Sequence, residues 1–122
     1  MIRSHRTQAP RPLSDAELEL IEALLGAAGG AGGRFLGQLT KVQVWGVCSC
    51  GCPSVDLMVD GKQREGAPKA LVVADGESPE GLPVGVILWI RGGALSGLEV
   101  HPWNGTDSIR LPPVESLTNF RR

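Results

Sequence analysis

The spacing of apolar residues changes near Lys41, and this change sets the fold class of the chain. Before Lys41 apolar residues recur every three or four positions, as on one face of a helix. After it they alternate with polar or small residues, as in strands that bury one face. Five strand-like runs follow, at residues 41–47, 54–60, 69–75, 84–91 and 95–103, and the run at 69–75 is apolar on both faces. The pattern predicts one helical region followed by about five strands.

A capping box marks the start of the helix. The Ser14 hydroxyl can accept a hydrogen bond from the Glu17 backbone N–H, while the Glu17 carboxylate accepts one from the Ser14 N–H. At about 100° per residue the apolar side chains fall on one side; they are Leu18, Leu20, Ile21, Leu24, Leu25 and Ala28. The glycines after Gly26 disfavour a long helix, so the helix is predicted to end near Ala28. "RFLGQL" is expected to add one further helical turn.

The connections between the strands predict an antiparallel sheet. Asp60-Gly61 and Gly92-Gly93 are dipeptides that favour tight turns, and no connection has room for a crossover helix. We therefore expect a meander in which strands pair in chain order. The predicted fold class is α+β, as a two-layer sandwich of one N-terminal amphipathic helix on an antiparallel sheet of about five strands.

The two ends of the chain lack this regularity. Residues 1–12, "MIRSHRTQAPRP", contain prolines and have no apolar period, which predicts a flexible arm. Residues 13–122 are expected to form a single α+β domain. The proline-broken tail from Ile109 onward could lie across a sheet edge or over the sheet face opposite the helix.

Charge and hydropathy exclude two classes of partner. A formal net charge of −1 offers no basic surface for a phosphate backbone, so nucleic acid is not expected as a partner. No apolar run reaches the roughly 18 residues of a membrane span, and no signal-peptide pattern follows the N-terminus. We therefore expect a cytoplasmic protein with no membrane partner.

All three cysteines lie within five residues, at Cys48, Cys50 and Cys52. On a straight strand their sulfurs would be too far apart for one tetrahedral zinc, but Gly51 and Pro53 could curl the segment. His101 is then the best fourth ligand for zinc, whereas Cu(I) would need the three thiolates alone. A metal site at these four residues is therefore a hypothesis.

Two other interpretations of the cysteine segment remain open. A nucleophilic cysteine would need a base, which His101 could supply with Asp56 or Glu99 as its orienting partner. Cysteine is also a small, readily buried residue that suits a tight turn between strands. This structural interpretation is the favoured one, so no cofactor and no enzymatic activity are expected.

The segments "CSCGCPSVDL", "VGVILWIRGGALSGLEVHPWNG" and "LPPVESL" resemble a group of small, functionally uncharacterised bacterial proteins of actinobacterial type. The resemblance covers most of the chain from Phe35 to Leu117. The matching positions are Cys50, Gly51, Cys52, Pro53, Asp56, Leu98, Glu99 and Val100. The resemblance supports the α+β fold but indicates nothing about activity, because none is established for the group.

The positions of the tryptophans suggest a binding surface. By alternation Trp45 shares a face with Gln43, Trp89 shares one with Arg91, and Trp103 shares one with His101. If these faces coincide, Trp45, Trp89, Trp103 and Arg91 form a partner-binding surface on the side of the sheet away from the helix. The sequence thus predicts a non-enzymatic protein-binding module, immunity-like or adaptor, whose partner is another protein or a second copy in a homodimer. The alternative is a thiolate metal-binding or redox-sensing protein built on the cysteines.

Overall fold

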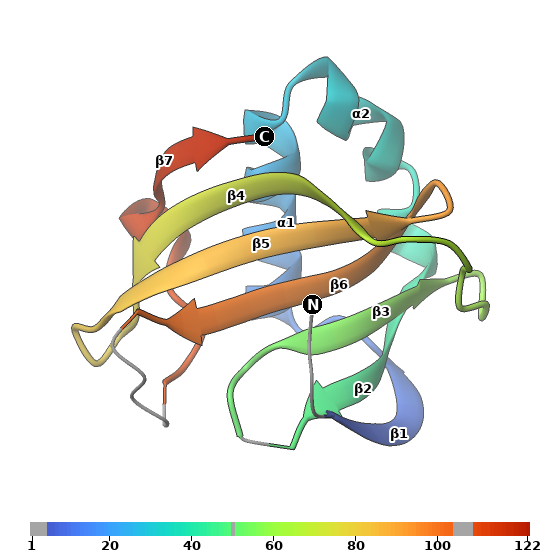
Figure 1. The fold of residues 1–122 in the computed structure, drawn as a ribbon, viewed down its shortest axis with the longest axis horizontal. Coiled ribbons are helices and arrows are strands. Elements are labelled where there is room, and N and C mark those ends of the chain that lie inside the picture. The colour runs from blue at the N-terminus through green and yellow to red at the C-terminus, as the bar shows by residue number, and fades with distance from the viewer. Residues whose placement is uncertain (1–4, 50, 104–108) are drawn as a thin grey trace.

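The computed structural model describes residues 5–49, 51–103 and 109–122 of the 122-residue chain. N-terminal helices pack on one face of a seven-stranded antiparallel sheet, which confirms the α+β prediction (Figure 1). The helical elements are α1 (Asp15–Ala27), α2 (Gly30–Leu36) and the 3-10 turns η1 (Leu39–Lys41) and η2 (Val114–Ser116). The strands are β1 (His5–Pro12), β2 (Val42–Cys48), β3 (Val55–Val59), β4 (Lys69–Glu77), β5 (Pro83–Arg91), β6 (Ala94–Pro102) and β7 (Thr118–Arg121).

Helix α1 begins and packs as its sequence predicts. Both hydrogen bonds of the capping box form: the Glu17 N–H donates to the Ser14 hydroxyl over 3.2 Å, and the Ser14 N–H donates to the Glu17 carboxylate over 2.8 Å. The apolar stripe is buried in the core from Leu20 onward, with Leu20 and Leu24 fully inaccessible to solvent, whereas Leu18 at its start is only partly buried. The first helix ends at Ala27, one residue before the predicted end, and Gly29 at φ 65° separates it from α2.

The strand order differs from the predicted meander. It is β1-β2-β3-β6-β5-β4-β7, so β3 pairs with β6 and not with β4. Residues 60–68 carry the chain from β3 past β6 and β5, a distance of about 14 Å at the usual strand spacing, which an extended loop of this length can span. Two further strands, β1 and β7, bring the sheet from the predicted five strands to seven.

The segment predicted as a flexible arm forms an edge strand instead. His5–Pro12 is strand β1, which pairs antiparallel with β2 through partners such as Thr7 and Gly46. An edge strand needs no apolar period, because backbone hydrogen bonds to one neighbour provide its pairing. The Arg11 guanidinium at its end also donates to both oxygens of the Glu17 carboxylate, over 2.9 and 3.0 Å. The arm therefore contributes to the fold.

Replacing Arg11 by Met is expected to lower the free energy of unfolding by about 1 to 2 kcal/mol at pH 7. The Glu17 side chain is only 6% exposed and would lose its cation, although the 39% exposure of Arg11 moderates the cost. Burial would raise the pKa of Glu17, but the hydrogen bonds from Arg11 and from the Ser14 N–H outweigh burial and hold this pKa below its usual value.

The sign of the pH dependence follows from the lowered pKa. The pair stabilises the fold fully above the unfolded-state pKa of about 4.3, and this contribution is lost as the pH falls through the folded-state value. Urea unfolding between pH 7 and pH 2 should show the difference between wild type and Arg11→Met shrinking toward low pH. A difference that stays constant over this range would contradict the ion-pair explanation.

The C-terminal tail packs on the helix side of the molecule. Ile109 and Leu117 are buried in the core, and β7 pairs with the edge of β4. A surface hollow of about 330 Å³ separates the tail from α1, with Ala16 and Pro112 among the residues that line it. The tail therefore lies along an edge and beside the helix, not over the opposite sheet face. No helix in the described part of the chain is long and apolar enough to cross a membrane.

Candidate functional site

The sheet face opposite α1 carries the tryptophans that the sequence singled out, and we call it the outer face. Figure 1 views the sheet from this side, with α1 behind it. Strand pairing places Gly46 opposite Asp56, Asp56 opposite Gly97, and Gly97 opposite Trp89 in one row across four strands. On β5 the side chains of the other face, Val84, Val86 and Leu88, are fully buried. The predicted division of β5 into two faces is confirmed.

Trp89 is positioned on the outer face by contacts with Gly97 and Glu99. A side chain at Gly97 would begin 3.8 Å from Trp89 Cβ and Cδ1, so the indole lies beside the bare backbone of that glycine. The indole Nε1–H donates to Glu99 Oε1 over 3.0 Å. Trp89 is half-buried. The Gly97 backbone lies on one side of it, and the Glu99 carboxylate lies at the edge of the indole.

His101 extends this arrangement along β6. A Cβ at Gly85 would lie 2.7 Å from His101 Cε1 and Nε2, so the imidazole occupies the space above that glycine. His101 Nδ1 lies 3.5 Å from Glu99 Oε2, and the imidazole meets the Trp103 ring edge-on with centroids 5.5 Å apart. Trp103 is 56% exposed, which makes it the most accessible large apolar residue among those described.

Trp45 and Arg91 lie together at a different part of the outer face. Both line a cavity of about 30 Å³, together with Leu57, Gln63, Arg64 and Ser96. The Trp45 Nε1–H donates to the Leu57 carbonyl oxygen over 3.3 Å, which fixes the indole next to β3. The pairing of β2 with β3 shifts register between Val44 and Gly46, at Trp45 itself.

The four predicted binding residues therefore share one face but form two groups. Trp89 and Trp103 are linked through Glu99 and His101, whereas Trp45 and Arg91 meet at the cavity. Sequence reasoning missed Arg64, Gln63 and Ser96. The first two come from the loop after β3, whose path depends on the unexpected strand order. Ser96 stands where the β5–β6 register shifts, which alternation alone does not reveal.

The cysteine segment is only partly described. Cys48 and Cys52 are partly buried, and Cys50 lies outside the described residues. Gly51 has φ 91°, and its N–H donates to the Cys48 carbonyl oxygen over 3.3 Å. Within residues 5–49, 51–103 and 109–122, no three His, Cys, Asp or Glu side chains gather as metal ligands. The metal hypothesis for Cys48, Cys50, Cys52 and His101 stays a prediction.

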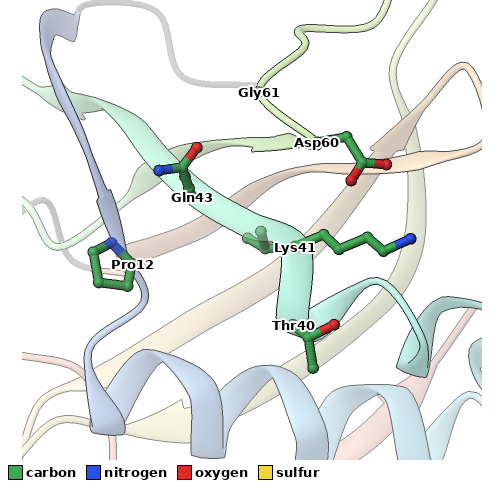
Figure 2. A pocket seen from close by; sticks show the side chains of 7 residues that line it. Pro12, Thr40, Lys41, Gln43, Asp60 and Gly61 are labelled. Atoms are coloured by element: carbon green, nitrogen blue, oxygen red, sulfur yellow. The ribbon is translucent and has the colours of Figure 1, made fainter.

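A wider hollow of about 550 Å³ opens where β1 ends beside β2. Figure 2 shows that the Lys41 and Asp60 side chains extend to one side of it, away from Pro12 and Gln43. Both charged residues are exposed, and their charges are opposite. Because its polar groups do not converge on a common point, we assign no site to this hollow.

Comparison with known proteins does not extend these observations. No protein-family model, no curated protein and no solved structure matches the chain. The resemblance to small bacterial proteins of actinobacterial type stays a prediction.

Proposed function

We propose that this protein is a non-enzymatic cytoplasmic protein-binding module, of an adaptor or immunity-like kind, whose binding surface is the outer face. The observation that carries the proposal is that this face holds Trp45, Trp89 and Trp103 while no helix or strand of the described chain lies over it (Figure 1). Tryptophan and arginine are the residues most often found to dominate the energy of protein interfaces.

The fixed geometry of the aromatic rings supports the same proposal. Trp89 lies beside Gly97 and His101 lies over Gly85, so both rings have little freedom left to lose when a partner binds. The Trp89–Glu99 hydrogen bond holds the indole edge in place. Ordering flexible side chains is a main cost of association, and a surface whose anchors are already fixed avoids much of it.

The chemistry of the face favours a different protein over a second copy of this chain. Stable homodimer interfaces are usually large and apolar. Here Arg91, Glu99 and His101 lie among the tryptophans. The buried carboxylate of Asp56 belongs to the same face. Such a mixture of charges of both signs is typical of interfaces between unlike partners, where polar groups provide specificity.

Replacing Trp89 by Ala is expected to weaken partner binding by about 30-fold or more, because an aromatic anchor commonly contributes at least 2 kcal/mol. The protein would first be used to isolate a saturably bound partner from the cells that produce it. Dissociation constants for the purified partner would then be measured by interferometry, with circular dichroism to confirm that the variant is folded.

Leu36→Ala is the matched control, since Leu36 is 48% exposed but belongs to α2 and not to the outer face. Equal affinities for wild type and a folded Trp89→Ala variant would refute the proposal. Sedimentation equilibrium tests the homodimer: a dimer of the wild type that Trp89→Ala abolishes would assign the face to a second copy of the chain instead.

A further inference from the structure

The cavity beside Trp45 lies where two strands of the sheet separate. β3 and β6 pair only through Val55 with Leu98 and Asp56 with Gly97. Next to these pairs, Leu57 of β3 and Ser96 of β6 line the cavity, together with Trp45 of β2 and Arg91 of β5. A β-sheet normally fills such a space with backbone hydrogen bonds. Here side chains line it.

Two hydrogen-bond donors at this cavity are buried without a partner in the described part of the chain. They are the Ser96 hydroxyl and the Arg64 Nε–H. Ser96 is only 7% exposed, so solvent has little access to it. Leaving a buried donor unpaired costs about 1 to 3 kcal/mol, and more when the group is charged. Unpaired donors on two residues that line the same cavity suggest an acceptor there.

Arg64 is held at the cavity by the β5–β6 turn. A Cβ at Gly92, which has φ 57°, would lie 3.1 Å from Arg64 Cβ and 2.9 Å from the Glu65 carbonyl oxygen. The stem of Arg64 thus packs against a turn that has no side chain of its own. This packing places the loop after β3 next to Arg91, the residue that precedes Gly92.

The charge and size of the cavity define the acceptor. Among the described residues that line the cavity, Arg64 and Arg91 are positively charged and none is acidic. Glu65 is exposed and does not line the cavity. Since a water molecule needs about 10 to 15 Å³ by this measure, 30 Å³ holds roughly two oxygen atoms. The two oxygens of a carboxylate match this volume.

We propose that this cavity binds a carboxylate of the protein partner, supplied by an aspartate or glutamate side chain. Arg64 and Ser96 donate to the carboxylate oxygens, Arg91 adds positive charge, and the Trp45 indole forms an apolar wall for the methylene stem. Planar guanidinium groups suit carboxylates because both present parallel hydrogen-bonding edges. This inference rests on the proposed function and assigns a chemical class to one part of the partner.

The test uses N-acetyl-glutamate methylamide as the probe and N-acetyl-glutamine methylamide as its neutral control. Titration of ¹⁵N-labelled protein should shift the Trp45 Nε1–H and Arg64 Nε–H resonances in a saturable manner, with a dissociation constant on the order of millimolar for so small a ligand. The glutamine compound should cause no such shifts. Equal shifts from both compounds, or tighter binding of inorganic phosphate, would overturn the assignment to a carboxylate.

Variants locate the binding at the proposed donors. Arg64→Gln keeps the stem that packs against Gly92 and should weaken binding of the acidic probe about tenfold, while Ser96→Ala should weaken it about fivefold. Arg34→Gln, at an exposed position in α2, should leave the affinity unchanged. An unchanged affinity in a folded Arg64→Gln variant would refute the proposal.

The same probe separates this inference from the proposed function. Trp89 does not line the cavity. Trp89→Ala should therefore leave the affinity for the acidic probe unchanged while it lowers the affinity for the protein partner. If the probe does not bind but Trp89→Ala still weakens binding of the partner, only the proposal of a carboxylate site is wrong. If the probe binds but Trp89→Ala leaves the partner's affinity unchanged, the carboxylate site stands and the binding role of Trp89 is wrong.

Discussion

Leu24→Ala is expected to lower the free energy of unfolding by about 2 to 4 kcal/mol. Leu24 lies on the buried stripe of α1, is fully inaccessible to solvent and belongs to the core formed by the helix and the inner sheet face. Truncation removes apolar surface from this core and leaves a cavity that the strands of a paired sheet cannot readily close. Urea unfolding followed by circular dichroism measures the change.

Glu19→Ala on the exposed side of the same helix serves as the control, and its effect should stay within about 0.5 kcal/mol. Both substitutions introduce alanine into the helix, so differences in helix propensity contribute little to the comparison. Equal losses of stability in the two variants would show that the helix does not cover the sheet with its apolar stripe.

Gly32→Ala is expected to destabilise the protein by about 2 to 3 kcal/mol, although alanine normally favours a helix over glycine. Gly32 lies in α2 where that helix crosses close to α1, and a Cβ there would lie 2.1 Å from the Leu25 carbonyl oxygen. A backbone oxygen cannot turn aside as a side chain can. The two helices would have to separate, which would weaken the packing of Phe35, a residue of α2, in the hydrophobic core.

Gly33→Ala provides a control one residue away. No atom lies within 4 Å of a Cβ at Gly33, and its φ is not positive, so alanine there should stabilise the protein by about 0.5 to 1 kcal/mol. Thermal and urea unfolding of both variants should therefore give changes of opposite sign. Changes of the same sign would mean that α2 does not approach α1 as closely as the structure has it.

The sequence predicted those features that depend on local patterns. The capping box of Ser14 and Glu17, the apolar stripe of α1 and the two faces of β5 are confirmed because each is determined by residues close together in the chain. The positions of Trp89 and Arg91 relative to the helix followed from alternation for the same reason.

The features that the sequence did not predict depend on pairing between distant segments. Strand β1 has no apolar period, and its place is determined by backbone pairing with β2 and by the bond between Arg11 and Glu17. The β3–β6 pairing rests on two residue pairs, which no periodicity encodes. The cavity beside Trp45 was missed with it, because Arg64 reaches Trp45 and Arg91 only when the loop after β3 crosses the sheet in this order.

The two strands that border the sheet make it a poor template for further strand addition. β1 includes Pro10 and Pro12, which lack the N–H needed to extend a ladder, and its register shifts between Thr7 and Arg11. β7 spans only Thr118–Arg121, and Asn119 within it has φ 55°, which departs from extended geometry. Such edges discourage fibril growth and domain swapping. They also disfavour partners that bind by adding a strand, so a ligand protein would approach the broad side of the sheet.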